Sequence, residues 1–195
     1  MDLVTILEKI TPLTQSCKNA LNGIIKLEYF DANTILTEPC NTSDTVYFLN
    51  SGIARVYYHT DTDTTVTARF ICEGEFAAIA MTLFLRSPSN DYIETLEYCQ
   101  ISTVQFGDFQ KLSLLFPELN TCLFCIYQEY LIRYEKELRF FRCHNNETRY
   151  NRFLEIHPRL GNRVKLKHVA SFLGMTQQHL SRLRNRLSKP TKKII

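Results

Sequence analysis

The sequence predicts an α+β protein with an N-terminal antiparallel β-roll, a long dimerisation helix and a C-terminal winged helix-turn-helix. Short runs of β-branched and aromatic residues fill the first half of the chain, and helical periodicities fill the last third. Charge divides in the same way, because residues 146–195 hold 12 basic and 2 acidic side chains, a net charge of +10, against −7 for the rest. We therefore expect a roll with an N-terminal helix at 1–117, a central helix at 118–145 and a helix-turn-helix domain at 146–195.

The predicted roll follows a weaker helical pattern at 3–21. From about Gly23 to Gln105, short strands alternate with breaks rich in Gly, Asn, Asp or Pro. Two of these breaks have the composition of hairpin turns, Asn50–Gly52 and the TDTDT run at 60–64. Such even spacing is typical of an antiparallel barrel or roll. The strand segments read TILTEP, TVYFLNSG, IARVYYHTDT, TVTARFICEG and YIETLEYCQISTVQF.

A long helix is predicted after Pro117. Apolar and aromatic residues recur there at spacings of four and three, with Glu, Arg and Lys between them, which is close to a coiled-coil seam. The alternative is a helix that packs only on its own domain. We favour a homodimer, because a two-fold axis along this helix would place two copies of the C-terminal domain side by side. The predicted interface residues are Leu123, Tyr127, Tyr130, Tyr134, Leu138 and Phe141.

The stretch LKHVASFLGMTQQHLSRLRNRL at 166–187 has the spacing of a helix, a glycine turn and a second helix. Gly174 provides the flexible backbone of the turn, and Thr176 has the position of an N-cap for the second helix. Only SKPTKKII follows, so the wing is either formed upstream around 163–167 or reduced to a stub. The buried faces of the two helices are predicted to hold Val169, Ala170, Leu173, Leu180, Leu183 and Leu187.

Double-stranded DNA is the leading candidate partner of this unit, because a polar helix face on a strongly basic domain is typical of major-groove readers. The alternative is a helical hairpin with a solvated face, in a protein-interaction or small-ligand module that binds nucleic acid only non-specifically. The predicted base-reading residues are Gln177, Gln178, Ser181 and Arg182. The predicted contacts to the DNA backbone are Thr176, Arg163, Lys165, Lys167, Arg186 and Lys189.

Other classes of function find little support in the sequence. It has no phosphate loop, nucleophile elbow or paired His and carboxylate motif, so we expect neither an enzyme nor catalytic residues. The seven cysteines are odd in number and scattered, and the Cys122–Cys125 pair has no second pair, so no metal site is expected. No apolar run is long enough to span a membrane and no signal peptide is present, which predicts a cytoplasmic protein without membrane contact.

The order of these parts resembles the Crp/Fnr transcription regulators over essentially the whole chain. The strand-rich roll, the EGEF turn at 73–76, the long helix and the TQQHLSRLRNRL segment carry the resemblance. It implies a jelly roll like that of cyclic-nucleotide-binding domains, a bacterial homodimer, RNA polymerase as a further partner and an unknown small-molecule effector. The family's base-reading positions fall on the four residues named above. Gln178 stands where many members have Glu, which implies a different DNA site because an amide pairs with adenine and a carboxylate with cytosine.

The sensor half departs from the family pattern. Members that bind cyclic AMP hold its phosphate with an Arg-Ser or Arg-Thr pair that follows a Gly-Glu. Gly74 and Glu75 are present, but Ser89 and Asn90 stand where that pair belongs, and Arg86 comes a few residues early. A buried cyclic phosphate without a cation loses its strongest hydrogen bonds, so we expect no cyclic nucleotide. The closely spaced N-terminal cysteines of iron–sulfur members are also missing, so we expect no cluster and no other cofactor. Either the roll is a degenerate sensor, or its effector pocket is formed by Phe70, Gly74, Glu75, Phe76, Arg86, Ser89, Asn90 and Tyr134.

Overall fold

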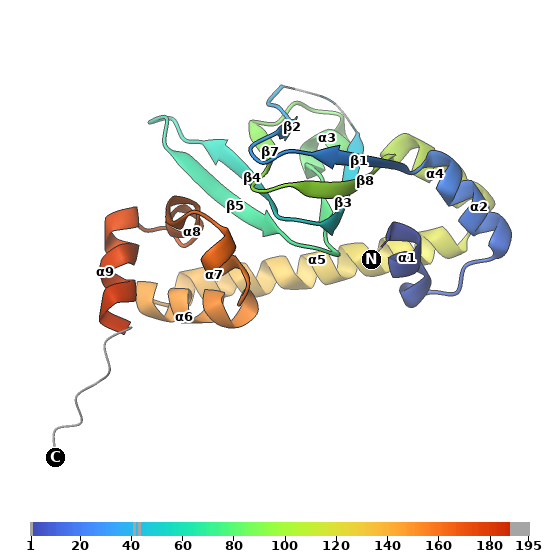
Figure 1. Cartoon of the computed structure of the whole chain (residues 1–195). Helices are drawn as coiled ribbons and strands as arrows, with labels where there is room; N and C mark the ends of the chain where they lie inside the picture. The colour runs from blue at the N-terminus through green and yellow to red at the C-terminus, as the bar shows by residue number, and fades with distance from the viewer. Residues whose placement is uncertain (1, 41, 43, 188–195) are drawn as a thin grey trace, which may run out of the picture.

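The computed structural model describes residues 2–40, 42 and 44–187, and it contains a strand-rich roll that lies along one long helix (Figure 1). The roll consists of two four-stranded antiparallel sheets with the strand orders β1-β8-β3-β6 and β2-β7-β4-β5. The predicted antiparallel roll is therefore confirmed. The strands are β1 (Lys26–Phe30), β2 (Ile35–Thr37), β3 (Thr45–Ser51), β4 (Ala54–His59), β5 (Thr65–Ile71), β6 (Phe76–Ala77), β7 (Asp91–Thr95) and β8 (Cys99–Gln105).

Both sheets contribute to one apolar core, because inward-facing and outward-facing residues alternate along the strands. Leu49 and Ile101 come from one sheet and Ile71 and Ile93 from the other, and all four are almost completely buried. Each predicted strand segment contains a strand, and the longest one contains two, β7 and β8, separated by residues 96–98. The sequence pattern does not predict the strands β1 and β6.

The turn between β3 and β4 depends on a glycine. Gly52 has a φ of +97°, and a Cβ atom at this position would lie 2.5 Å from the Sγ of Cys99 and 2.8 Å from the carbonyl oxygen of Tyr98. A larger residue would therefore meet both backbone strain and a steric clash. The sequence Asn50–Gly52 marks a turn correctly, but the predicted hairpin is wrong, because β3 and β4 belong to different sheets and do not pair with each other.

The helical pattern at 3–21 becomes two helices, α1 (Leu3–Ile10) and α2 (Gln15–Ile24), with side-chain N-caps from Asp2 and Thr14. They pack against the beginning of the long helix α5 (Glu118–Cys143), where Leu7, Leu21 and Leu119 are buried together. Two further helices belong to the roll, α3 (Ala80–Leu85) and α4 (Phe106–Leu115).

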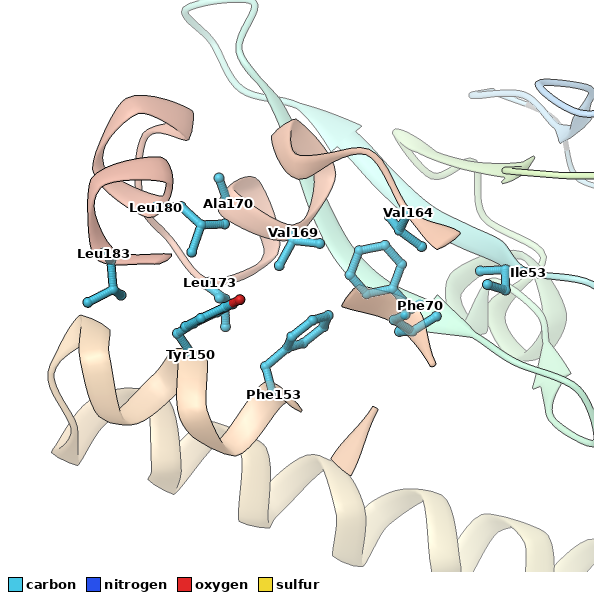
Figure 2. Close-up of a cluster of buried hydrophobic side chains, with 11 residues drawn as sticks. Ile53, Phe70, Tyr150, Phe153, Val164, Val169, Ala170, Leu173, Leu180 and Leu183 are labelled. Atoms are coloured by element: carbon cyan, nitrogen blue, oxygen red, sulfur yellow. The ribbon is translucent and has the colours of Figure 1, made fainter. Parts of the chain in front are cut away.

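Four helices follow α5 and form the C-terminal unit: α6 (Asn146–Ile156), α7 (Leu160–Arg163), α8 (Leu166–Phe172) and α9 (Gln177–Leu187). Their buried residues form one cluster, which also takes in Ile53 and Phe70 from the roll (Figure 2). The C-terminal unit is therefore packed on the roll as well as on itself. Of the residues predicted to be buried, Val169, Ala170, Leu173, Leu180 and Leu183 lie in this cluster, whereas the prediction for Leu187 is wrong, since it is 40% exposed.

The described part of the C-terminal unit contains no strand that could form the predicted wing. Residues 163–167 form the end of α7, an extended link and the first turn of α8, so the upstream position for a wing is wrong. The residues after Leu187 lie outside the described ranges. Among the described residues, no helix is both long and apolar enough to cross a membrane.

Candidate nucleic-acid interface and effector cavities

The connection between α8 and α9 is a tight turn with a helix-stopping hydrogen-bond pattern. Gly174 has a φ of +69°, its N–H donates to the carbonyl of Ser171, and the N–H of Met175 donates to the carbonyl of Ala170 at 3.0 Å. These two bonds satisfy the last carbonyls of α8 in the manner of a Schellman motif, which requires a left-handed residue at the position of Gly174. The helix, glycine turn and helix predicted from the sequence are thus present.

The side chain of Thr176 caps α9, since its Oγ1 accepts a hydrogen bond from the N–H of His179 at 3.2 Å. Leu180 and Leu183 are 0% and 5% exposed, so one face of α9 is fixed against the cluster of Figure 2. Burial of these two leucines determines which residues of α9 face away from the protein.

Three of the four predicted base-reading residues, Gln177, Gln178 and Arg182, are exposed on α9, and Ser181 is half-buried. Arg182 forms no ion pair with any residue of the described ranges, and its Nε lies 3.4 Å from the carbonyl oxygen of Gln178. The helix has no acidic residue from its first turn to its last. This face therefore presents amide and guanidinium donors without a competing carboxylate.

The predicted backbone contacts are in different surroundings. Lys165 and Lys167 are exposed at the beginning of α8, and Thr176 is exposed beside Gln177. Arg186 pairs with Glu147 on α6, whereas Arg163 pairs with Glu73 and Glu97 of the roll. Lys189 lies outside the described residues. Arg163 therefore serves as a contact to the roll in this conformation, and the sequence offered no signal for its acidic partners.

The junction between the roll and the C-terminal unit is built from aromatic rings and from one serine. Phe172 of α8 lies 5.3 Å from Phe70 of β5 and 5.6 Å from Phe141 of α5, measured between ring centroids. The Oγ of Ser171 accepts a hydrogen bond from the N–H of Thr67 at 2.7 Å and donates one to the carbonyl of Thr65 at 3.1 Å. Strand β5 and helix α8 are thus held together by a continuous set of contacts.

His168 of α8 is buried at the same junction. Burial, together with the charges of Arg55, Lys167 and Lys165, lowers the pKa of this imidazole to about 4. The neutral ring is therefore the form that fits the folded protein. The sequence pattern did not single out this residue.

The predicted effector residues do not gather at one pocket. Phe70 is part of the junction, Gly74 is in the turn before β6 with a φ of +86°, and Glu75 pairs with Arg133 of α5. Arg86 lies 3.1 Å from a carboxylate oxygen of Asp44, and Ser89 donates a hydrogen bond to Asp91. Asn90 is exposed. These side chains are occupied by partners in the protein or lie at the surface.

Two adjoining cavities lie between the roll and α5. We call the first the apolar chamber: it has a volume of about 150 Å³ and is lined by residues that include Phe48, Phe76, Phe84 and Tyr127. The second, the polar vestibule, has a volume of about 240 Å³ and is lined by residues that include Asp91, Tyr134 and Glu137. Both cavities share Arg69, Ala78, Ala80 and Tyr130. Of the predicted effector residues, Phe76 lines the chamber and Tyr134 the vestibule.

The predicted dimer residues divide among three environments. Leu123 and Tyr127 line the apolar chamber, and Phe141 packs into the C-terminal junction. Tyr130 lines both cavities, and the guanidinium of Arg69 lies 5.0 Å from its ring centroid. Tyr134 lines the vestibule and is 55% exposed, whereas Leu138 is exposed and lines neither cavity. Four further large apolar side chains of α5 are exposed: Phe124, Leu131, Ile132 and Leu138, at 67%, 58%, 45% and 39%.

The two closely spaced cysteines of α5 differ in how deeply they are buried. Cys122 is buried, and burial raises the pKa of its thiol to about 11, whereas Cys125 is half-buried. No group of three or more His, Cys, Asp or Glu side chains that could hold a metal ion occurs in the part of the chain that the structure describes.

Comparison with known proteins agrees with this architecture. Residues 27–114 match the family model of the cyclic nucleotide-binding domain. A search of curated proteins finds no match. Among solved structures, the regulator CLP of Xanthomonas campestris is 16% identical, with 89% of this chain and 91% of that chain covered and a TM-score of 0.71. FixK2 of Bradyrhizobium japonicum is also 16% identical, with 84% of each chain covered and a TM-score of 0.71.

A third solved structure, CooA of Carboxydothermus hydrogenoformans, is 19% identical, with 93% of this chain and 83% of that chain covered and a TM-score of 0.68. Each of these three similarities covers at least 84% of this chain. Residues 27–114 therefore resemble a cyclic nucleotide-binding domain, and the chain has the fold of Crp/Fnr regulators.

Proposed function

We propose that this protein is a sequence-specific DNA-binding transcription regulator of Crp/Fnr type that acts as a homodimer. The observation that carries the proposal is the face of α9, where Gln177, Gln178 and Arg182 are exposed together while Leu180 and Leu183 are buried. A helix held in this way can enter the major groove and bring amide and guanidinium groups to base edges.

Charge supports the same partner. The C-terminal 50 residues have a net charge of +10, and Lys165 and Lys167 are exposed at the beginning of α8. Cations at this end of the unit are suited to contact phosphates, which fix the register of the protein on DNA without reading sequence. The solved relatives add a family-level argument, since CLP is described as a global regulator that links cell–cell signalling to gene expression.

The open side of α5 supports dimerisation. Phe124, Leu131 and Leu138 follow each other at intervals of seven residues, which keeps them on one helix face. Large exposed side chains in such a row are costly in a monomer and are typical of an interface. We therefore assign the helix–helix contact to this stripe together with Tyr134, rather than to Leu123, Tyr127 and Phe141.

The contacts at the junction supply a route from the roll to α9. A ligand that prefers one arrangement of the roll and α5 over another would change how β5 supports α8 through Phe70, Phe172 and Ser171. Because α8 and α9 share a buried cluster, a shift of α8 would move the base-reading face.

Selection of bound sequences from a random duplex pool tests the proposal. We expect enrichment of a near-palindromic site with half-sites about one DNA turn apart. The variant Gln178→Glu should change the preferred base at one position per half-site from adenine to cytosine, because a carboxylate accepts from cytosine N4. If the protein instead binds all duplexes equally and its affinity falls steeply with salt, the result would support non-specific binding by a basic surface.

A further inference from the structure

We propose that the apolar chamber and the polar vestibule together bind a small apolar carboxylic acid, with its tail in the chamber and its carboxylate at Arg69. The inference rests on the proposed function only in making this acid the regulator's effector, because binding itself does not require DNA. No cation of the roll other than Arg69 lines both cavities in the described ranges.

Arg69 is a half-buried cation that makes no direct ion pair in the described residues, although the charges of Glu75 and Glu137 act on it from farther away. Its guanidinium lies over the ring of Tyr130, and it forms no ion pair or hydrogen bond with the residues that the structure describes. Burial lowers the pKa of this guanidinium, which shows that its charge is poorly solvated. A desolvated, unpaired guanidinium gains more from a carboxylate than an exposed one does, because the charge-assisted bonds form in a medium of low dielectric constant.

The nearest acidic side chains do not serve as that partner. Glu75 is paired with Arg133, and Glu137 stays unpaired in the vestibule, where burial raises the pKa of its carboxyl. Arg133 therefore has a carboxylate partner within the protein, whereas the N–H groups of Arg69 donate no hydrogen bond in the described residues.

The chamber next to Arg69 fits an apolar group of limited size. Phe48, Phe84 and Phe106 contribute three of its walls, and a cavity of this volume lined by apolar side chains can hold a benzene ring. The nitrogens of a purine would lose their hydrogen bonds to water in such surroundings. The chamber therefore favours a hydrocarbon tail over a nucleobase.

One polar atom of the chamber also lacks a partner. The hydroxyl of Tyr127 is buried without a hydrogen-bond partner in the described residues, and burial raises its pKa to about 12. An unsatisfied buried hydroxyl destabilises the empty protein. Tyr127 lies three residues before Tyr130 on the same side of α5, and both residues line the chamber.

Calorimetric titration of the full chain with 3-phenylpropionate tests the inference. We expect the acid to bind at least about 10-fold more tightly than 3-phenylpropanamide, which lacks the charge, and than acetate, which lacks the tail. Arg69→Gln should reduce the ratio between acid and amide to about one. The matched control is Arg139→Gln, which removes an exposed arginine of α5 and should keep the ratio.

A second variant, Ala78→Leu, adds bulk where the two cavities meet and should abolish binding of the acid with Arg69 still present. Unchanged melting curves of the unliganded variants would show that they fold. Absence of binding of the acid to the wild-type protein at 10 mM, or an unchanged ratio in Arg69→Gln, would overturn the inference. Selection of a DNA site is measured separately, so its failure would contradict the proposed function and leave this binding result standing.

Discussion

Arg163 of α7 donates a hydrogen bond from Nη2 to the carboxylate of Glu73 at 2.7 Å and binds Glu97 through the same guanidinium group. The two acidic residues belong to the roll and the arginine to the C-terminal unit. Burial, the largest single cause, raises the pKa of Glu73, but the hydrogen bond and the charge of Arg163 together with backbone hydrogen bonds outweigh burial, so the pKa is lowered. One side chain thus links the predicted sensor and DNA-binding parts.

Arg163→Gln should loosen this link and lower the free energy of unfolding by about 1 kcal/mol, because the ion pair is partly exposed. The loss should shrink at high salt, since screening already weakens the wild-type pair. Urea unfolding at low and high salt measures it. Arg159→Gln, which changes an exposed arginine without an ion pair in the described ranges, should leave the unfolding free energy within about 0.5 kcal/mol.

Arg182→Ala should cost about 1 to 3 kcal/mol of binding free energy at a selected DNA site and little on random duplexes, because its guanidinium is exposed on the base-reading face. Lys167→Ala should weaken binding to all duplexes about equally and reduce the salt slope by about one. Fluorescence anisotropy with both DNAs compares the two variants. Equal losses on specific and random DNA for Arg182→Ala would contradict the base-reading role.

Leu131→Glu should convert the dimer into a monomer, because it places a charge in the middle of the exposed stripe Phe124–Leu138. Sedimentation equilibrium measures the association state. Lys136→Glu adds the same side chain at an exposed position of α5 outside that stripe and should leave the dimer intact. A wild-type protein that is monomeric at micromolar concentration would refute the dimer proposal directly.

The stability of the protein should fall as the pH falls from about 6.5 to about 4, because His168 is neutral in the folded state. The unfolded imidazole has a pKa of about 6.5 and binds a proton in this range, whereas burial keeps the folded pKa at about 4. Protons therefore bind preferentially to the unfolded state, at a cost on the order of 2 to 3 kcal/mol at the acidic end.

Unfolding experiments at a series of pH values measure this dependence. His168→Gln should flatten the decline between pH 6.5 and 4 and leave the curve above pH 7 nearly parallel to that of the wild type. His144→Gln, a change at an exposed histidine just after α5, is the matched control. An identical decline in His168→Gln would show that other groups cause it.

Local sequence patterns were sufficient for most strands of the roll, for α5 and for the α8–α9 pair, but not for β1 and β6. Runs of β-branched and aromatic residues mark the strands, and Gly52 and Gly174 mark turns that need a positive φ. The face of α9 was predictable for the same reason. Burial of Leu180 and Leu183 at helical spacing leaves the predicted readers outside.

Contacts between distant segments could not be predicted in this way. The helix α5 carries apolar residues on more than one face, and the pattern alone cannot tell the face that packs on the roll from the one left open. For that reason Leu123 and Tyr127 were assigned to a dimer contact, although they line the chamber. Order along the chain predicts that the effector residues share one pocket. In the structure Phe70 contacts Phe172, whereas Arg86 pairs with Asp44.

The sequence by itself therefore determined most strands of the roll, the long helix and the helix–turn–helix segment with its polar face, because these depend on residues within one or two turns of each other. Only the tertiary structure decided the partners of Arg163, the packing of Arg69 on Tyr130 and the burial of His168. Glu73 precedes Arg163 by 90 residues. Charge pairing and burial across such separations depend on how the packed elements meet, and no local periodicity encodes that.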